Sequence, residues 1–446
     1  MSIWIETKLK ESEIGKIPLD WSCTTLNKIA DINPKPIKLD SDDIEVSFVG
    51  MADVSESAKL MNTTNRLYGE VKKGFTSFQD NDVLVAKITP CFENGKGALV
   101  SNLTNGIGFG STEFHVIRAK EQKGCPEFIH HITTTHNFRV KGEMNMTGTA
   151  GQKRVGKDFI ASYLIACPPF VEQQKIAEIL STVDKKIDLI DQKIAETEKL
   201  KTGLMQKLFS EGVGVQDENG EWQPHTEFQY DSLLGKKPKS WQTETLGNIL
   251  DIASSKRIKR EEYVNEGVPF YRSKEIILKS KQLSFTPEIF ISRERFDKLS
   301  EKFGSPQQGD ILISAVGTIG AIYRVRDEEF YFKDGNLLWI RNIDKSGLSS
   351  EFLECYFRSY LCQEMLANLS AGSSQNALTI VKLSKLPLII PTKDEQKMIV
   401  SIISSINEKI YLLKAQKSET QQLKKGLMQK LLTGEWRVPL EETEAA

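Results

Sequence analysis

The sequence has 446 residues, of which 39% are hydrophobic and 27% charged, and its formal net charge at pH 7 is −1. This length suggests about three domains. The near-neutral charge argues against binding to nucleic acid through bulk charge alone, although it allows a local basic groove. There is no run of 18 apolar residues and no cleavable leader, and the six cysteines include no CxxC pair. We therefore expect a cytoplasmic protein with reduced thiols.

The first part of the chain has the pattern of a mixed α/β domain. Residues 14–32, IGKIPLDWSCTTLNKIADI, open it, and β-branched runs bounded by Gly, Asn and Asp follow. These runs predict strands at 46–50, 81–88, 97–100 and 114–118. Three nearby histidines (His130, His131 and His136) have no metal-ligand spacing. They predict a helix on a domain surface, and we expect no metal site.

A long helix follows this domain. Its apolar positions are separated by four, three, four, three and four residues: Ile176, Leu180, Val183, Ile187, Ile190 and Ile194. This is the 3.5-residue spacing of a coiled-coil seam, and Gly and Pro are absent from 172 to 202. The next segment, 211–231, is rich in Gly and polar residues and has no period, which predicts a linker.

The second half of the chain repeats the first. Residues 234–252 echo 14–32, and strands are predicted at 268–272, 309–317, 321–325 and 337–341. Residues 391–431 match 168–208 without a gap at 19 of 41 positions. Both copies begin with Pro-x-x-x-Glu-Gln and end with Gly-Leu-Met-Gln-Lys-Leu. Because neither helix can bury its apolar seam alone, we expect the two seams to pack against each other.

The seam of the second helix is irregular. It begins with five apolar residues: Ile399, Ile403, Ile406, Ile410 and Leu413. Lys417 and Lys424 then interrupt it. We expect Leu412, Leu423 and Leu427 to shift the contact stripe there, or the far end of the coil to be looser or to face a partner.

These features divide the chain into six segments. They are an α/β domain at 1–170, a helix at 171–212, a linker at 213–233, an α/β domain at 234–391, a helix at 392–436 and a tail at 437–446. The tail, RVPLEETEAA, is expected to be disordered. The predicted fold class is α+β, with two mixed α/β domains in tandem, each followed by a long helix.

Enzyme motifs are weak. Cys167-Pro168-Pro169-Phe170 resembles the Asn/Asp-Pro-Pro-Phe/Tyr signature of amino-group methyltransferases, but Cys cannot orient the target amine as Asn or Asp does. The second copy reads Ile-Pro-Thr-Lys, so the prolines more simply start a helix. The glycines at 106, 108 and 110 do not form a cofactor loop, because no clear strand precedes them and a strand follows. We expect no catalytic residues.

Two polar surfaces remain as candidates for DNA binding. Gln, Asn, Lys and Arg can donate hydrogen bonds to base edges and phosphates, and such residues occur in the loops 147–155 and 370–379. In the first domain the candidates are Lys87, Thr89, Asn94, Lys96, Gln152, Lys153 and Arg154. In the second domain they are Arg272, Ser273, Lys274, Ser314, Thr318, Gln375 and Asn376. The alternative for each is an ordinary polar residue of a surface or connector.

The doubled order of these segments resembles a known family. IGKIPLDW, PPFVEQQKIAEIL and GLMQKL, repeated around a variable α/β middle, are similar to the specificity subunit of type I restriction–modification systems. The resemblance runs from Ile14 to Val438. It implies two target-recognition domains, each reading one half of a split DNA sequence. It also implies that the long helices pack antiparallel, with a pseudo-two-fold relation, and set the length of the unread spacer.

The resemblance also implies partners. Two modification subunits would bring S-adenosylmethionine and adenine methylation, and two restriction subunits would bring translocation and cleavage that need ATP and Mg. This chain would hold no cofactor, would not be an enzyme and would not meet a membrane. Three alternatives stay open: a related system whose partner fuses methyltransferase and nuclease, a coiled-coil scaffold that binds only protein, and a self-contained methyltransferase.

Overall fold

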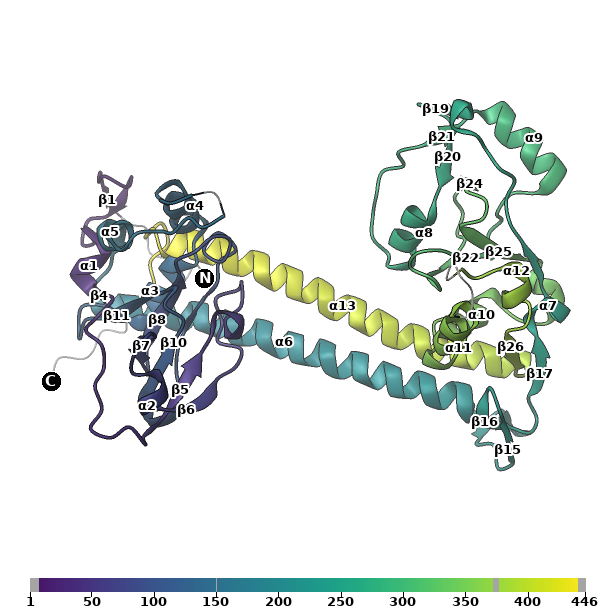
Figure 1. Ribbon diagram of the computed structural model, residues 1–446, viewed down its shortest axis with the longest axis horizontal. Coiled ribbons are helices and arrows are strands. Elements are labelled where there is room, and N and C mark those ends of the chain that lie inside the picture. Colours follow the sequence, from purple (N-terminus) through teal and green to yellow (C-terminus); the bar gives the residue numbers. More distant parts are fainter. Residues whose placement is uncertain (1–7, 150, 372–376, 440–446) are drawn as a thin grey trace. The chain divides into compact units, whose positions relative to one another are not determined.

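The chain forms two compact units. The computed structural model describes residues 8–149, 151–371 and 377–439. Unit 1 contains the residues up to Asp191 and those from Ala415 onward, and unit 2 contains Gln192–Lys414. Each unit therefore combines one α/β domain with part of both long helices, α6 (Phe170–Ser210) and α13 (Lys393–Leu431) (Figure 1).

The domain of unit 1 is built mostly of short strands. Its elements are β1 (Leu9–Lys10), β2 (Ile17–Pro18), β3 (Ser22–Thr25), α1 (Leu26–Ile29), β4 (Ala30–Ile32), β5 (Glu45–Val49), η1 (Met51–Asp53), β6 (Thr64–Leu67), α2 (Tyr68–Val71), β7 (Thr76–Gln79), β8 (Asp82–Ala86), β9 (Gly97–Leu99), η2 (Thr104–Gly106), β10 (Ile107–Gly110), β11 (Phe114–Ala119), α3 (Pro126–Thr133), α4 (His136–Met144), α5 (Lys157–Ser162) and β12 (Leu164–Cys167). The four strands predicted from the sequence are all present, within two residues at each end.

Two four-stranded sheets form the framework of unit 1. One has the order β4-β11-β8-β9 and is antiparallel; the other has the order β6-β5-β10-β7, with β5 and β10 parallel. Side chains of a strand alternate between its faces, so β8 can be buried on both sides. Val83 and Val85 pack in the same core as Phe128 of α3, and Leu84 packs with Phe78 in a second core.

The domain of unit 2 repeats this plan. Its elements are β13 (Val215–Gln216), β14 (Trp222–Gln223), β15 (Phe228–Asp231), β16 (Gly235–Pro238), β17 (Gln242–Thr245), α7 (Leu246–Ile249), β18 (Asp251–Ala253), η3 (Arg260–Glu262), β19 (Tyr263–Val264), β20 (Val268–Tyr271), α8 (Ser273–Ser280), β21 (Phe290–Ile291), α9 (Arg293–Phe303), β22 (Ile311–Ser314), β23 (Ile322–Arg324), β24 (Tyr331–Phe332), β25 (Leu337–Arg341), η4 (Ile343–Ser346), α10 (Ser350–Phe357), α11 (Tyr360–Ser370), α12 (Ile380–Leu383) and β26 (Pro387–Ile390). The sheet β18-β25-β22-β23 matches β4-β11-β8-β9 strand for strand, and a second sheet has the order β19-β21-β20-β24.

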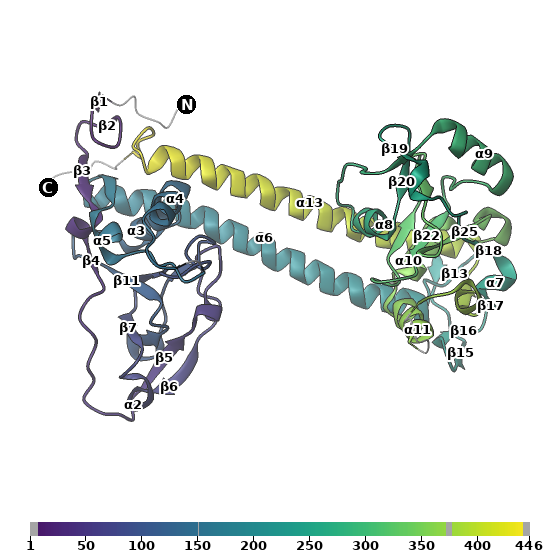
Figure 2. The same cartoon turned by 45° about the horizontal axis from the view of Figure 1, so that its top comes forward.

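The two long helices pair antiparallel within each unit (Figures 1 and 2). In unit 1, Asp184 lies 2.7 Å from Lys424 and Asp191 lies 2.6 Å from Lys417, so positions later in α6 meet positions earlier in α13. In unit 2, Glu198 lies 2.8 Å from Lys414. Apolar residues of both seams are buried beside these pairs: Ile176, Leu180, Ile187 and Ile190 in unit 1, and Ile399, Ile403 and Ile410 in unit 2. The predicted packing of the two seams is confirmed.

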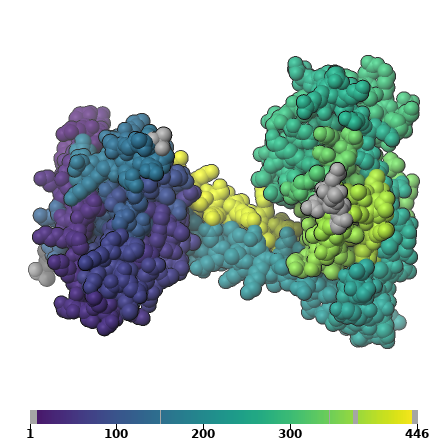
Figure 3. Space-filling view, in the orientation of Figure 1, coloured from purple at the N-terminus to yellow at the C-terminus, as the bar shows by residue number. Residues whose placement is uncertain are grey.

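The predicted shift of the second seam is wrong. Leu412 and Leu423 are 58% and 55% exposed, so they do not join the helix contact. Figure 3 shows atoms of both helices at the surface of the molecule. The seam instead continues in register through Lys417, Lys424 and Leu427, and each lysine pairs with an Asp of α6. A charge in a seam is tolerated when its partner is supplied by the facing helix.

A buried Trp–Glu hydrogen bond anchors the start of each long helix to its domain. Trp21 donates through Nε1 to Glu172 at 2.9 Å, and Trp241 donates through Nε1 to Glu395 at 2.7 Å. Both Trp rings and both carboxylates are buried. A buried charge needs several hydrogen bonds to offset the loss of water, and these carboxylates accept more than one.

The glutamine that follows each glutamate also binds the domain backbone. Gln173 accepts from the N–H of Cys125 at 3.0 Å and donates to the carbonyl of Lys123 at 2.9 Å. Gln396 accepts from the N–H of Ser349 at 2.9 Å and donates to the carbonyl of Gly347 at 3.2 Å. These matching bonds explain why Pro-x-x-x-Glu-Gln opens both copies of the helix.

The predicted linker contains a short hairpin, and the start of the tail is more ordered than expected. In unit 2, β13 and β14 form a hairpin, and His225 Nε2 lies 2.9 Å from Glu395. In unit 1, Arg437 donates to Glu172 at 2.6 Å and to Asp20 at 2.7 Å, and Val438 is buried. The expectation of disorder is therefore wrong for residues 437–439, and 440–446 lie outside the described residues.

One smaller expectation changes, and the glycines near residue 108 have a structural explanation. His130 and His131 lie on α3 as a helix predicts, but His131 is buried in the domain rather than on its surface. Residues 107–110 form the strand β10 inside a sheet, which explains their glycines, since a Cβ at Gly108 would meet the Phe78 ring at 2.1 Å. In the part of the chain that the structure describes, no helix is long and apolar enough to cross a bilayer.

Candidate nucleic-acid interface

In unit 1, the segment after β8 lies beside the segment that leads to α5. The N–H of Thr89 donates to the carbonyl of Lys153 at 3.0 Å, and the N–H of Val155 donates to the carbonyl of Lys87 at 3.0 Å. The structure thus brings Lys87 and Thr89 next to Lys153 and Arg154, which are more than 60 residues away in the sequence. Strand-like pairing holds both segments rigidly.

Only some of the polar side chains in this group are free. Lys87 donates to a backbone carbonyl at 2.7 Å, and burial lowers its pKa. Arg154 donates hydrogen bonds to both carboxylate oxygens of Glu113 at 2.7 and 3.0 Å, and these bonds lower the pKa of Glu113. Gln152 and Lys153 are exposed, and among the described residues Lys153 has no ion-pair partner. These two are the side chains best placed to meet a ligand.

The turn between β8 and β9 is stabilised by its own polar groups. Asn94 donates to Glu56 at 2.9 Å, and Lys96 donates to the carbonyl of Met51 at 3.0 Å. The hydroxyl of Thr89 donates to the carboxylate of Glu93 at 2.6 Å. Asn94, Lys96 and Thr89 would have to give up or share these bonds to contact DNA, so their proposed role remains a prediction.

A basic cleft beside this group was not found from the sequence. It has a volume of about 610 Å³, and its lining contains four lysines and one acidic residue, Asp31. The lysines come from three separate segments: Lys28 and Lys35 from the stretch 27–35, and Lys120 and Lys157 from two later parts of the domain. Such a cleft attracts phosphates without bulk positive charge on the chain. No local pattern in the sequence reveals it, because each lysine is isolated.

His115 connects the cleft to the neighbouring loop. The amide of Asn33, which lines the cleft, lies 3.0 Å from Nδ1 of His115, and Nε2 of His115 lies 2.9 Å from the carbonyl of Val155. Nε2 therefore carries the hydrogen and Nδ1 accepts from Asn33. Burial lowers the pKa of His115 to about 4, so the ring is neutral at pH 7. This chain of bonds holds the cleft wall and the loop in one arrangement.

Unit 2 is also basic after its corresponding strand. β18 is followed by the sequence SSKRIKR at 254–260, in which Lys256, Arg257, Lys259 and Arg260 are exposed. A local run of basic side chains on a domain of near-neutral charge is typical of a phosphate-binding surface. This run was visible in the sequence, and it corresponds in position to the Lys35 side of the unit 1 cleft, since β18 matches β4.

The candidates predicted at α8 of unit 2 are paired with acidic groups. Arg272 lies 2.5 Å from Glu275 and 2.8 Å from Glu288, and Lys274 lies 2.9 Å from Glu288. The hydroxyl of Ser273 donates to a backbone carbonyl at 3.3 Å. These residues form a network at the start of α8, so their positive charge is largely compensated.

The remaining candidates of unit 2 differ in accessibility. Ser314 is buried, and its hydroxyl donates to the carbonyl of Thr318 within a turn, which disfavours a direct contact with DNA. Thr318 is exposed between β22 and β23. Gln375 and Asn376 lie outside the described residues. In the described part of the chain, no group of three or more His, Cys, Asp or Glu residues could hold a metal ion.

Comparison with known proteins identifies related sequences. The family model described as "Type I restriction modification DNA specificity domain" matches residues 18–199 and 238–422. The Type I restriction enzyme EcoEI specificity subunit of Escherichia coli is 41% identical over 178 residues, which cover 40% of this chain and 29% of that protein. The match thus spans less than a third of this relative. The putative MjaX specificity subunit of Methanocaldococcus jannaschii is 24% identical over 98% of this chain and 99% of its own length.

Solved structures show the same fold. One is described as "Structural basis underlying complex assembly and conformational transition of the type I R-M system". It has a TM-score of 0.60 and 22% identity, and the match covers 94% of this chain and 99% of that one. The type I restriction–modification S subunit from M. genitalium has a TM-score of 0.52 and 17% identity, covering 96% of this chain and 99% of that one. The fold class predicted from the sequence is confirmed.

Proposed function

Because this chain belongs to the type I restriction–modification DNA specificity family, we propose that it reads a bipartite DNA sequence on behalf of partner enzymes. Each unit would read one half of the target. The observation that carries this proposal is the repeated placement of basic side chains after β4 and β18, on two domains that share the order of one four-stranded sheet and have different surfaces. Domains that share a fold but differ in side chains would read different half-sites.

The chemistry would belong to the partners. Modification subunits would supply S-adenosylmethionine and adenine methylation, and restriction subunits would use ATP and Mg, all in the cytoplasm. We propose two of each, because the chain presents two copies of its long helix. This chain would bind and position DNA without itself being an enzyme.

The test is the pattern of DNA methylation in a host that expresses this chain together with its modification subunit. The wild type is expected to give adenine methylation at one split motif, which disappears when the chain is omitted. Lys153→Ala in unit 1 should weaken or relax one half of the motif, and Arg257→Ala in unit 2 should affect the other half. Lys73→Ala is the matched control, because Lys73 is exposed and follows α2, far from α5 in the domain (Figure 1).

The alternatives give other results. Dependence of methylation on a single fused methyltransferase–nuclease partner would indicate the related type of system. Stable complexes with partners but no motif that depends on this chain would indicate a scaffold that binds only protein. Methyl transfer by the purified chain alone would contradict the non-catalytic role.

A further inference from the structure

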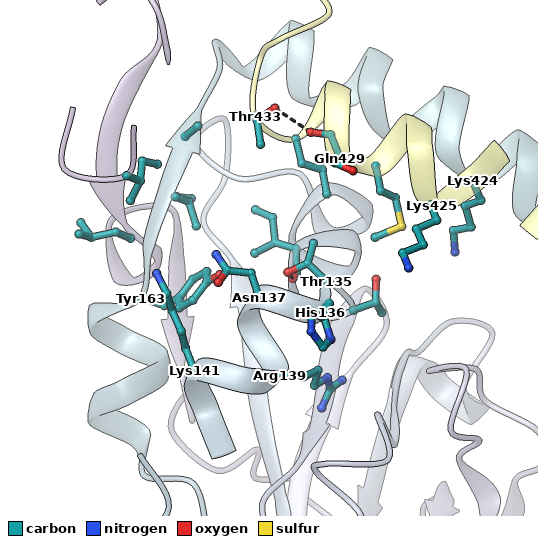
Figure 4. A pocket seen from close by; sticks show the side chains of 18 of the residues that line it. Thr135, His136, Asn137, Arg139, Lys141, Tyr163, Lys424, Lys425, Gln429 and Thr433 are labelled. Carbon is teal, nitrogen blue, oxygen red and sulfur yellow. Dashed lines mark hydrogen bonds between the residues drawn. The ribbon is translucent and has the colours of Figure 1, made fainter. Parts of the chain in front are cut away.

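A cavity of about 840 Å³ lies in unit 1 between the last turns of α13 and the start of α4 (Figure 4). Apolar side chains such as Ile132, Ile165, Met428 and Leu432 form part of its wall. This volume is in the range of sites for small molecules rather than of grooves for duplex DNA. The candidate DNA-binding residues do not line it.

The lining is strongly basic. It includes six residues that carry or can carry positive charge: Lys16, His136, Arg139, Lys141, Lys424 and Lys425. Lys424 is paired with Asp184, but Lys425 has no ion-pair partner among the described residues. Figure 4 shows Lys424 and Lys425 pointing from α13 toward the start of α4, where Thr135 and His136 lie. The one acidic residue of the lining is Glu93.

Arg139 is an unusual member of this lining. It is only 8% exposed, and its terminal nitrogens donate to two carbonyls at 3.2 and 3.3 Å. Its Nε has no hydrogen-bond partner among the residues that the structure describes. Burial lowers the pKa of Arg139 to about 10, because the charged form loses water without gaining a carboxylate. A nearby anion would stabilise this guanidinium.

The start of α4 adds backbone donors. Thr135 caps the helix by accepting from the N–H of Phe138, and the first turn contains no acidic side chain. The N–H groups of His136 and Asn137 are therefore left for another acceptor, as in the first turn of any helix. With the cations of α13 opposite, this end of α4 has the donors that bind a phosphate or sulfate in other proteins.

One acceptor completes the site. Glu93 accepts from the hydroxyl of Thr89 through one oxygen, and its other oxygen, Oε2, is buried with no partner in the described part of the chain. A ligand with a hydroxyl or amino group could donate to this oxygen while its anion meets the cations. Buried polar atoms without partners are uncommon in folded proteins, so two in one cavity need an explanation.

Unit 2 has different side chains at two of the corresponding positions. At the position of Leu432 it has Phe209, whose ring packs 5.8 Å from Phe352 and 5.7 Å from Tyr356. At the position of Lys425 it has Thr202. The free lysine is therefore a feature of unit 1, and it is not needed to join a domain of this fold to a long helix.

We propose that this cavity binds a small phosphorylated molecule, with the phosphate between Lys425 and the start of α4 and a hydrogen-bond donor of the ligand at Glu93. The ligand could be a nucleotide or an inorganic phosphate, because both offer the same anion. Either would link the C-terminal end of α13 to the domain of unit 1, and so would stabilise their contact.

The test uses the purified full-length chain and isothermal titration with pyrophosphate, AMP and adenosine. Pyrophosphate or AMP is expected to bind, whereas adenosine is not. Lys425→Thr, which copies unit 2, and His136→Gln should each weaken binding about tenfold, the loss of one charge-assisted hydrogen bond. Lys430→Thr, on the same helix but outside the lining, should leave the affinity unchanged. Hydrogen exchange should show ligand-dependent protection of residues 134–141.

Each outcome of these measurements supports or overturns the proposal. AMP binding more tightly than pyrophosphate supports a nucleotide, and pyrophosphate binding alone supports an inorganic source. Absence of binding by both at millimolar concentration overturns the proposal. Equal binding of AMP and adenosine, or equal loss in Lys430→Thr and Lys425→Thr, also overturns it. Protection of 134–141 by duplex DNA but by neither small phosphate would assign the cavity to the nucleic-acid interface instead.

Discussion

Replacing Glu172 by Ala should destabilise unit 1 and leave unit 2 intact. The carboxylate is fully buried and accepts three hydrogen bonds, from Trp21 at 2.9 Å and from two nitrogens of Arg437 at 2.6 and 2.9 Å. Without it, Arg437 keeps its hydrogen bonds to Asp20, and the Trp21 N–H loses its acceptor. Removing one partner of a buried ion pair costs about 3–5 kcal/mol. We expect a loss of that size in the free energy of unfolding of unit 1.

The assay must resolve the two units, because a chain of two compact units need not unfold in one step. Calorimetry should show one transition lowered by roughly 6–20 °C, since each kcal/mol shifts a unit of this size by about 2–4 °C. Hydrogen exchange should assign that transition to peptides of unit 1. The mirrored variant Glu395→Ala should move the loss to unit 2, where Glu395 accepts from Trp241.

The matched control is Glu178→Ala, on the same helix. Glu178 is exposed, and its pair with Lys175 spans 2.8 Å on the surface, so its loss should change stability by no more than about 0.5 kcal/mol. The reasoning is refuted if Glu172→Ala and Glu178→Ala have similar effects, or if both units lose protection equally in Glu172→Ala.

Three further changes test other parts of the structure. Asp184→Ala should lower the free energy of unfolding in urea by about 1–3 kcal/mol, because it leaves the half-buried Lys424 unpaired. Glu198→Ala removes a pair that is more than half exposed and should lower it by less than about 0.5 kcal/mol. Similar values for the two variants would contradict this ranking. His131→Leu should stabilise unit 1 by about 1 kcal/mol at pH 7, because neither ring nitrogen of this buried histidine has a partner. Burial lowers the pKa of His131 in the folded state to about 3. Below about pH 6.5 the unfolded state therefore binds more protons than the folded state. The free energy of unfolding then falls by up to about 1.4 kcal/mol per pH unit as the pH drops toward 3. Thermal unfolding at pH 7 and pH 5 should show a smaller difference in His131→Leu, and an unchanged difference would exclude this histidine as the cause. Lys153→Ala should remove about one phosphate contact from the assembled complex with DNA. The slope of log K against log salt concentration should then become shallower by about 1. An unchanged slope would show that Lys153 does not contact DNA.

The sequence predicts the elements that depend on local spacing. The strands of both domains and the two long helices have periods that lie within a single segment, and all are present. The seam at Lys417 and Lys424 could not be predicted in the same way, because the acids that neutralise these lysines lie on the other helix. The start of each helix was recognised as a repeated motif, but its partner, Trp21 or Trp241, is about 150 residues away.

The candidate interface was only partly predictable, for the same reason. The pairing of the Lys87 and Lys153 segments brings predicted residues together, yet the neighbouring lysine cleft is assembled from three segments that are far apart in the sequence. Ser314 was a candidate for DNA binding at the end of a predicted strand, and its burial follows from the turn after β22 that closes over it. Composition can indicate which residue types are present near a site, but burial and ion pairing decide which of them are free.

The division of the chain into units affects the order in which the protein can fold during synthesis. Unit 2 is one continuous stretch, Gln192–Lys414, whereas unit 1 needs the residues from Ala415 onward. Leu431, Leu432 and Val438 are buried in the core of the domain that begins the chain. Because domains fold as units while the ribosome moves along the message, the domain made first is completed last. Until then it exposes the apolar surface that the end of α13 will cover, so loss of the final residues by a nonsense mutation would damage the N-terminal domain and spare the second.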